Sequence, residues 1–428
     1  MKSIINEQLI YFVWTYKLFQ SKLFTHGSHK PIEIIHPGIR NSDSGPDFTN
    51  ARVRIDGLVW VGDVEMHLQA SDWHRHKHTH DAAYNSVILH VVAKADTIIT
   101  DTNGREIPVL ELDIPASVLD EYQHFMQSEQ KIMCGSKLKD IDKFVLHSWL
   151  QRMQIERIEG KYAYIESLFR FLGNDLNETF YVLLAKGFGF HTNSLPFEQL
   201  AKNLPFSLLL KNIDNADTLF ALTYGQAGWL DIQAEDDYTA KLQREYKFYK
   251  HKYHLTSIDA SLWKTNRIRP ANHPHLRLAQ WLTLVSKFHT LAFAADDVKN
   301  IDDARNFFNI EIPEYWRSHY ALAKPSESRK SELSEDTKHL LILNTLLPFI
   351  YFRHRFLGNM EVDDLMEKIL TEIPSEKNSI VNEWKSYGIK PESAFESQAL
   401  LQLYNEYCTR KKCLHCRIGH QLLIKSVS

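Results

Sequence analysis

Two carboxylates and an imidazole mark the stretch of this chain best suited to chemistry. Asp47 follows Pro46 in a turn, and Glu65 and His67 occupy alternate positions in the strand-like segment from Leu58 to Leu68. Successive side chains of a strand leave opposite faces of its sheet, so Glu65 and His67 share one face and the intervening apolar residues share the other. Carboxylates with an imidazole suit a divalent cation that can activate water.

A tight turn can bring these groups together. Asp56-Gly57 separates two strand-like runs, and glycine supplies the positive φ that a short hairpin turn needs. If the two runs pair, Asp47 returns close to Glu65 at the far end of the hairpin. We therefore predict a site for Mg²⁺ or Mn²⁺ at Asp47 and Glu65, with His67 orienting water or holding a phosphate.

These residues resemble the core motif of the PD-(D/E)XK nucleases. Pro46-Asp47 is followed by Glu65-x-His67, with His67 where that family usually has lysine. The resemblance implies phosphodiester hydrolysis with DNA or RNA as substrate. In several nucleases of this class a helical glutamate joins the metal site, which makes Glu7 a further candidate. The alternative for Glu7 is a solvated first-turn carboxylate favoured by the helix dipole.

The order of expected elements is similar to that nuclease core. A helix over about residues 7–22 precedes a short strand at residues 32–36 and the hairpin, and a polar helix at about residues 72–84 precedes the apolar strand 87–92. We expect this αβββαβ succession to form a restriction-endonuclease-like α/β domain over residues 1–115. Residues 116–428 have long amphipathic segments and few strand signals, so we expect a mostly α-helical second domain.

The whole chain also resembles a bacterial family known only as a domain of unknown function. The stretches that carry this resemblance are Ser44 to Phe48, Gly62 to His67, Asp72-Trp73 and the C-terminal Cys413-x-x-Cys416-x-Ile418-Gly419. This resemblance groups the chain with related proteins but indicates no activity.

A histidine-rich stretch follows the hairpin. His74, His76, His78 and His80 alternate with other residues, and imidazole is a good ligand for zinc or copper. On a helix, however, only pairs four residues apart share a face, so a polar helix beside the sheet is the favoured interpretation. A zinc hydrolase that uses His76 and His80 is the lower-ranked alternative. His90, within an apolar strand, is either a hydrogen-bonded core residue or a neighbour of Glu65.

The cysteines form the sharpest local pattern. Cys408, Cys413 and Cys416 lie close together near the C-terminus, and Cys134 lies far upstream. Two thiolates from Cys-x-x-Cys can grip one metal from a tight turn, and Cys134 completes four ligands if the C-terminus folds back to the domain junction. We predict a structural site for zinc or an iron–sulfur cluster, and the spacing leaves both open. His415 or His420 could replace Cys134 in a zinc site.

The cysteine arrangement looks like that of iron–sulfur nucleases of DNA repair and CRISPR adaptation. In those proteins one upstream cysteine and three C-terminal cysteines clamp the nuclease domain. Cys134 departs from their order because it follows the expected strands rather than preceding them.

Three arginines in the expected helical domain are candidates for nucleic-acid binding. Arg267, Arg269 and Arg277 flank two prolines just before a helix, and the guanidinium fork suits phosphate. The alternative is an interdomain brace in which these arginines pair with acidic helices or cap backbone carbonyls.

Composition restricts the function only weakly. The formal net charge is −3, so no global field indicates nucleic acid or membrane as the partner. We find neither an apolar run long enough to cross a bilayer nor a cleavable leader, and we expect a cytoplasmic protein without membrane contact. The sequence thus predicts a metal-dependent nuclease with a structural cysteine site. The alternative is a non-catalytic nucleic-acid- or protein-binding module on the same fold.

Overall fold

The computed structural model describes residues 5–19, 22–328 and 332–427, and the chain divides into two compact units. The first unit comprises Met1–Met153, Lys377–Lys390 and Ala399–Ser428, and the second comprises Gln154–Glu376 and Pro391–Gln398. An N-terminal mixed sheet and a largely helical remainder confirm the predicted class at that level.

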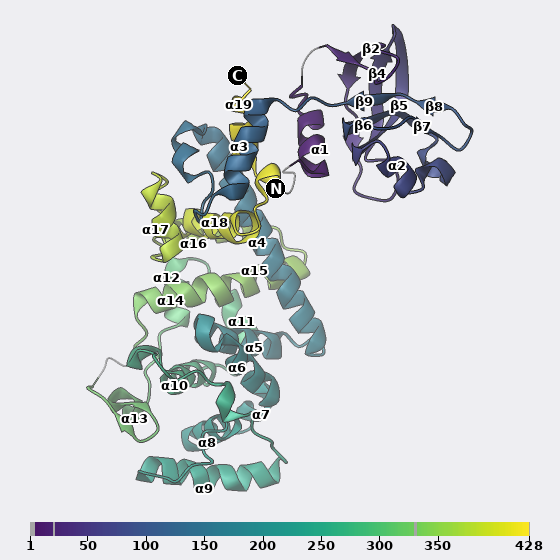
Figure 1. The fold of residues 1–428 in the computed structure, drawn as a ribbon. Helices are drawn as coiled ribbons and strands as arrows, with labels where there is room; N and C mark the ends of the chain where they lie inside the picture. The colour runs from purple at the N-terminus through teal and green to yellow at the C-terminus, as the bar shows by residue number, and fades with distance from the viewer. Residues whose placement is uncertain (1–4, 20–21, 329–331, 428) are drawn as a thin grey trace. The chain divides into compact units, whose positions relative to one another are not determined.

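A mixed sheet forms the framework of the first unit (Figure 1). Its strand order is β1-β2-β4-β5-β6-β9, with β3 paired to β4. The strands are β1 Leu23–Phe24, β2 Pro31–His36, β3 Ile39–Arg40, β4 Phe48–Ile55, β5 Leu58–Gln69, β6 Val87–Lys94 and β9 Val109–Glu111. Pairing is antiparallel from β1 to β5 and parallel from β5 to β9. A strand between parallel neighbours is covered on both faces, which explains the unbroken apolar and buried run of β6.

The turn between β4 and β5 sets the register of the hairpin. Asp56 and Gly57 have φ values of 54° and 82°, the two positive angles of a type I′ turn. Phe48 then lies opposite Val64, with a β-bulge between Phe48 and Ala51. This register places the residue before Phe48 beside the residue after Val64.

The first helix is shorter than predicted. α1 spans Glu7–Thr15 instead of reaching Lys22, and its N-terminus is capped by the side chain of Asn6. Lys17 adopts a left-handed conformation with φ of 50°, which turns the chain away from the helix axis. Residues 20 and 21 of the predicted helix lie outside the described residues.

The predicted polar helix at residues 72–84 is wrong as a continuous element. The structure has helix α2 (Asp72–Arg75) and two short 3₁₀ helices, η1 (His78–His80) and η2 (Ala82–Tyr84). Lys77 breaks the helix, because its φ of 64° is incompatible with a right-handed turn. Spacing on one helical face therefore does not decide which of these histidines lie together.

Different groups of side chains pack against the two faces of the sheet. Buried side chains of α1 pack in one cluster with Val64 and Met66 of β5. Trp73 of α2 packs in another with Val87 and Val92 of β6. The alternation along β5 therefore directs its apolar side chains toward α1, and the intervening side chains toward the opposite face.

Further elements complete the first unit. They are the hairpin β7 (Ile99–Thr100) with β8 (Glu106–Ile107), helices α3 (Ala116–Gln127), α17 (Ser379–Ser386) and α19 (Arg417–Lys425), the 3₁₀ helices η3 (Gly135–Asp140) and η8 (Cys413–His415), and the π-helix η7 (Tyr404–Cys408). Two helices cross the unit boundaries, α4 (Lys143–Phe171) and α18 (Ala394–Leu403).

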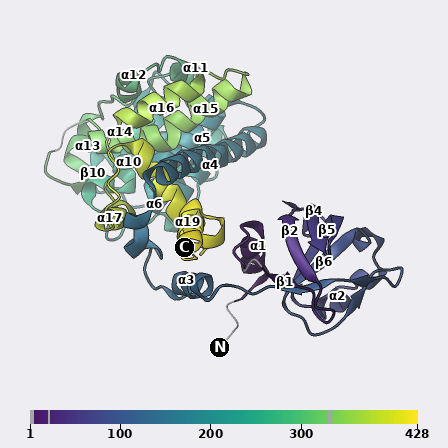
Figure 2. The ribbon, with the colours of Figure 1, turned by 90° about the horizontal axis from the view of Figure 1, so that it is seen from above.

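The second unit is built mainly from helices, several of which pack side by side (Figure 2). They are α5 (Leu176–Phe188), α6 (Phe190–Asn203), α7 (Phe206–Leu210), α8 (Ala216–Gln226), α9 (Asp237–Lys252), α10 (Pro274–Val285), α11 (Leu291–Asp296), α12 (Ile301–Phe307), α13 (Glu314–Ser318), α14 (Glu335–Leu341), α15 (Leu347–Phe356) and α16 (Val362–Glu372). Shorter elements are the 3₁₀ helices η4 (Ala260–Leu262) and η5 (Pro270–Asn272), the π-helix η6 (Ile342–Leu346) and the strands β10 (His319–Ala321) and β11 (Lys324–Pro325). No helix among the described residues is both long and apolar enough to cross a bilayer.

Replacing Gly57 by alanine is expected to loosen the β4–β5 hairpin. An alanine at this positive φ costs about 1 kcal/mol, which makes local opening about fivefold more frequent. Hydrogen–deuterium exchange of the β4 and β5 amides measures this change. The matched control is Gly160→Ala in α4, where an added Cβ meets nothing within 4 Å. Equal hairpin exchange in Gly57→Ala and wild type would contradict the role of the turn.

Candidate functional site

The hairpin register brings Asp47 and Glu65 side by side. The backbone N–H of Asp47 donates to Glu65 Oε2 at 3.0 Å, and the N–H of Met66 donates to Asp47 Oδ2 at 3.0 Å. Tyr11 of α1 donates its hydroxyl to Asp47 Oδ1 at 2.8 Å. The two carboxylates are therefore held by backbone groups of neighbouring strands, and both oxygens of Asp47 accept a protein hydrogen bond.

Two histidines lie beside the other oxygen of Glu65, and a third lies beside one of them. Glu65 Oε1 lies 3.5 Å from His67 Nε2 and 3.5 Å from His78 Nε2. His76 Nδ1 lies 3.0 Å from His67 Nε2, and one ring nitrogen from each histidine lies within 4.8 Å of the others. Ligands about 2.0–2.1 Å from a zinc ion are about 3.3 Å apart in a tetrahedron. The separations of 3.0 and 3.5 Å are close to this spacing, and the wider ones, up to 4.8 Å between the histidine nitrogens, would have to shorten around one ion.

The break in the polar helix creates this cluster. The left-handed Lys77 lies between His76 and His78, so their side chains reach the same place without sharing a helical face. Tyr84 stacks on the His78 ring at a centroid distance of 3.7 Å. His78 Nε2 is buried and, among the described residues, has no hydrogen-bond partner. A buried polar atom of this kind is costly unless a ligand satisfies it, and a metal ion would do so.

His90 on β6 contacts His67 and so helps to hold the cluster in place. It is fully buried, and its Nε2 lies 2.9 Å from His67 Nδ1. A ligand role for His67 Nε2 requires the proton on Nδ1, where His90 Nε2 accepts it. Such a hydrogen bond fixes the tautomer and orientation of a metal-binding imidazole.

Burial favours the neutral forms of Glu65, His67 and His78. It raises the pKa of Glu65 to about 9, and the neighbouring Asp47 and Glu7 add to that increase. Burial and the other histidines lower the pKa of His67 to about 2, and burial lowers the pKa of His78 to about 4. His67 and His78 are therefore neutral, which is the form that binds metals, and no Lys or Arg among the described residues lies within ion-pair distance of Glu65 to supply positive charge. A divalent ion would supply that charge.

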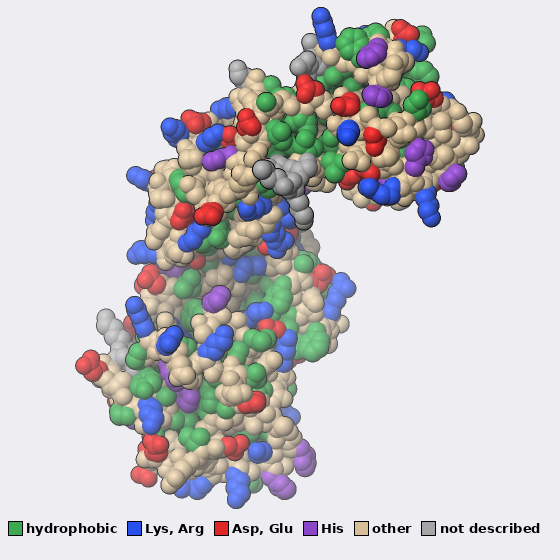
Figure 3. Space-filling view, viewed as in Figure 1, with side chains coloured by type: hydrophobic (Ala, Val, Ile, Leu, Met, Phe, Trp, Pro, Cys, Tyr) green, Lys and Arg blue, Asp and Glu red, His purple; other side chains and the backbone are tan. Residues whose placement is uncertain are grey.

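One side of the cluster is open to solvent. His67 and His78 are buried, whereas His76 is exposed. Two exposed arginines are near: Arg40 lies over the Tyr11 ring, with its guanidinium carbon 4.9 Å from the ring centroid, and Arg75 pairs with Asp72. Figure 3 shows histidine, acidic and basic side chains close together on the surface of the sheet-bearing part.

The structure thus places the three predicted catalytic residues beside histidines that the sequence pattern did not favour as metal ligands. Asp47, Glu65 and His67 lie together, and the pKa of Glu7 is raised by burial and then by Asp47. His76 and His78 belong to the cluster, whereas His80 is exposed and outside it. The alternate spacing of the histidines indicated a metal site. The prediction of a continuous helix, on which only pairs four residues apart share a face, argued against that site.

The four cysteines line one small pocket in the first unit. Cys134 precedes η3, Cys408 ends η7, and Cys413 and Cys416 flank the turn before α19. Burial raises the pKa of Cys413 to about 12, and Cys416 adds to this increase. Burial and the other cysteines also raise the pKa values of Cys134 and Cys408. Thiolates in one buried pocket would need a cation to offset their charge, and the zinc or iron–sulfur group at these cysteines stays a prediction.

Gly419 allows this pocket to close. An added Cβ at that position would lie 2.2 Å from the backbone oxygen of Cys413. Backbone N–H groups of Ile418 and Gly419 also hydrogen-bond Cys416 at the start of α19. The Cys-x-x-Cys-x-Ile-Gly pattern therefore has a packing reason as well as a ligand spacing.

The three predicted nucleic-acid-binding arginines do not form one surface. Arg267 and Arg269 are exposed, whereas Arg277 is only 6% exposed. Its guanidinium donates to Gln280 Oε1 at 2.9 Å and to Asn272 Oδ1 at 2.6 Å. Arg277 is therefore held inside the second unit, because both terminal nitrogens of its guanidinium donate there and its burial keeps phosphate away.

Comparison with known proteins identifies the family of the chain. Residues 7–379 match the family described as "Protein of unknown function (DUF2851)", and the chain belongs to this family. No curated protein and no solved structure matches the chain.

Zn²⁺ or Mn²⁺ is expected to bind the Glu65 cluster and stabilise the protein. When the free metal concentration is 100 times the dissociation constant, binding raises the free energy of unfolding by about 2.7 kcal/mol. Calorimetric titration and thermal melting measure both effects. Glu65→Gln and His78→Ala should weaken binding by at least about tenfold, whereas the neighbouring His80→Ala should not. Equal metal affinity in His78→Ala and His80→Ala would refute the assignment.

Protein purified without oxygen is expected to carry a metal at the cysteine pocket. A brown colour with iron and sulfide indicates a cluster, and colourless protein with stoichiometric zinc indicates a zinc site. Cys134→Ser should lose that metal and melt at a lower temperature, whereas Ser136→Ala, an exposed neighbour, should retain it. Full metal content in Cys134→Ser would show that Cys134 is not a ligand.

Proposed function

We propose that this member of the DUF2851 family is a metal-dependent phosphodiester hydrolase, with DNA or RNA as its substrate. The observation that carries the proposal is the convergence of Glu65, His67, His76 and His78 beside Asp47. Of the predicted Mg²⁺ and Mn²⁺, this imidazole-rich set favours Mn²⁺, and zinc or iron would also suit it.

The sheet topology supports the nuclease part of the proposal. An antiparallel hairpin carries the acidic pair, and a parallel strand follows after a crossover, an arrangement similar to the PD-(D/E)XK core. The β-bulge between Phe48 and Ala51 lies next to the acidic pair, and such bulges are common beside active sites. The chain differs from the nuclease motif at His67, which serves as a candidate metal ligand where lysine is usual.

Each protein group has a separate task in the proposed reaction. Glu65 and the three ring nitrogens would hold the ion, and His90 would keep His67 in the tautomer that can bind it. Asp47 positions Glu65 through its backbone N–H and is itself oriented by Tyr11. A bound divalent ion would activate water and neutralise charge on the phosphate.

Substrate would approach from the exposed side of His76. Arg40 and Arg75 are exposed there and can contact phosphate oxygens, which guanidinium groups recognise well. Their charge also favours binding of an anionic backbone next to a site that contains several carboxyl groups.

A binding module without cleavage is the second candidate. Tyr11 and Met66 occupy both oxygens of Asp47, so that carboxylate has less freedom to bind an ion. The nuclease lysine is also replaced by His67. These observations favour recognition of nucleic acid by a metal-stabilised but inactive fold.

Purified protein is expected to cleave single- or double-stranded DNA or RNA when Mn²⁺, Zn²⁺ or Mg²⁺ is added. Labelled oligonucleotides followed on denaturing gels measure the rate. Glu65→Gln and His76→Ala should lower it by about 100-fold or more, because each removes a ligand.

His80→Ala provides the matched control and should cleave like wild type. Absence of cleavage for every substrate and metal would refute the hydrolase. Salt-sensitive binding that persists in Glu65→Gln would then support the binding module. Cleavage of equal rate in wild type and Glu65→Gln would show that another site is responsible.

A further inference from the structure

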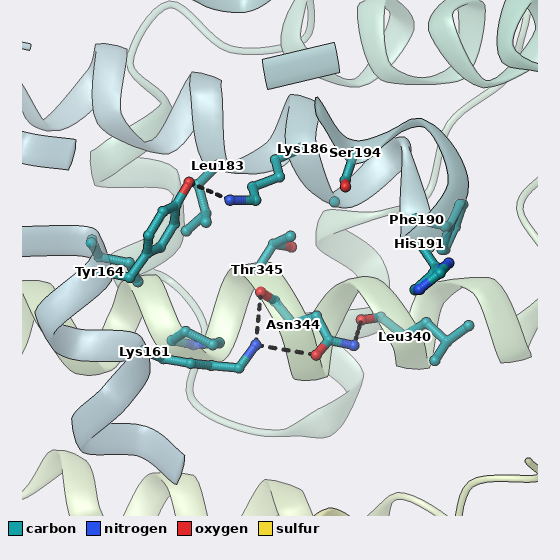
Figure 4. Close-up of a pocket in the computed structure, with 13 residues that line it drawn as sticks. Lys161, Tyr164, Leu183, Lys186, Phe190, His191, Ser194, Leu340, Asn344 and Thr345 are labelled. Atoms are coloured by element: carbon teal, nitrogen blue, oxygen red, sulfur yellow. Dashed lines mark hydrogen bonds between the residues drawn. The ribbon is translucent and has the colours of Figure 1, made fainter. Parts of the chain in front are cut away.

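A hollow in the helical unit has the size of an organic-ligand site. It lies among α4, α5, α6 and the segment from α14 to α15 (Figure 4). Its volume is about 480 Å³, and sites for small organic molecules span about 300–1,000 Å³. The lining is mostly apolar, with Ile165, Leu183 and Pro348 among its walls, and a few polar side chains point inward.

The side chains of Arg157 and Lys161 both hydrogen-bond to the neutral amide of Asn344 in the wall of the hollow. Lys161 Nζ lies 3.1 Å from Asn344 Oδ1, and Arg157 Nη2 lies 3.2 Å from the same oxygen. Arg157 and Lys161 are one turn apart on α4, so they repel each other. Among the described residues, neither has a carboxylate oxygen within ion-pair distance, although Glu376 is close enough to act on both electrostatically. Burial and Arg157 hold the pKa of Lys161 well below its usual range.

Lys186 differs from Lys161 because its charge is already matched. Its ammonium donates to Tyr164 at 2.7 Å and lies 2.9 Å from Glu198 Oε2. Figure 4 shows Lys161 and Lys186 approaching the same space from α4 and α5. Lys161 therefore has hydrogen-bonding capacity left to offer a ligand, whereas Lys186 lines the hollow as a fixed, paired cation.

The polar wall is built on a distorted helix. Asn344 and Thr345 belong to the π-helix η6, and such elements are frequent at functional sites. Asn344 Nδ2 donates to the Leu340 backbone oxygen at 3.0 Å, which fixes the amide with its oxygen toward Lys161. Gly187 of α5 lets η6 approach, because a Cβ there would lie 2.2 Å from Thr345 Cγ2. The wall is therefore preformed and close-packed.

We propose that this hollow binds a phosphate monoester carried on an apolar or aromatic body. Lys161 contacts the phosphate directly, the bound dianion favours the protonated form of its amine, and Arg157 adds positive charge behind it. The apolar walls take the body of the ligand, and His191 and Ser194 offer polar contacts at the far side. This site lies within the second unit and does not depend on the metal cluster of the first.

Pyridoxal 5′-phosphate is a probe that reports binding and position together. It is an aromatic phosphate monoester whose aldehyde condenses with an unprotonated lysine amine, releasing water, and borohydride then reduces the imine to a stable amine. Peptide mass spectrometry measures the label at each lysine. Lys161 is expected to react at least about tenfold faster than the exposed Lys385, and inorganic phosphate should slow its labelling.

Variants separate the proposed roles. Lys161→Met should lose the fast label. Arg157→Met should be labelled more slowly than wild type, because Arg157 helps to lower the pKa of Lys161, and it should lose protection by phosphate. Circular dichroism establishes that both variants fold. Labelling of Lys161 no faster than Lys385, or labelling unaffected by phosphate, would overturn the proposal. Fast labelling of a lysine outside the hollow in folded Lys161→Met would overturn the assignment to this hollow.

Discussion

Burial of Glu65 among other ionisable groups is the constraint on which the sheet-bearing unit depends. Two carboxylates and several imidazoles lie within one small region, and burial keeps the imidazoles neutral while it disfavours the carboxylates. Like charges about 4 Å apart repel by about 4 kcal/mol at a surface-like dielectric. A protein that retains such a cluster has either an unusual cost in stability or a cation to offset it, and the spacing of the ligand atoms favours the cation.

The surrounding fold is arranged to hold that cluster in place. The type I′ turn and the bulge set which residues of β4 and β5 face each other. Gly62 allows β5 to approach the chain before β6, since a Cβ there would lie 2.6 Å from the Ser86 backbone oxygen. His90 and Trp73 then close the face opposite α1, so the orientation of His67 is set by packed neighbours rather than by solvent. This pre-organisation is what a metal site requires.

The same logic recurs in the cysteine pocket and the helical hollow. In each, a glycine allows backbone or side-chain groups to approach within contact: Gly419 at Cys413, and Gly187 at Thr345. In each, burial disfavours the charged form of ionisable groups of one kind: it raises the pKa of Cys134 in the first and lowers the pKa of Lys161 in the second. Uncompensated charge in a preformed pocket is destabilising by itself, and the bound group that neutralises it recovers that free energy.

The amino-acid sequence was sufficient for features that depend on local rules. Asp56-Gly57 indicated the hairpin, alternation along β5 separated Glu65 and His67 from the apolar face, and the cysteine spacing indicated one shared pocket. Tertiary structure decided the rest. The left-handed Lys77 broke a helix that the pattern favoured and so placed His76 and His78 beside Glu65. Packing buried Arg277, and it joined Arg157 and Lys161 to an amide far along the chain. Local propensity cannot encode such encounters, because they depend on which distant surfaces the core brings into contact.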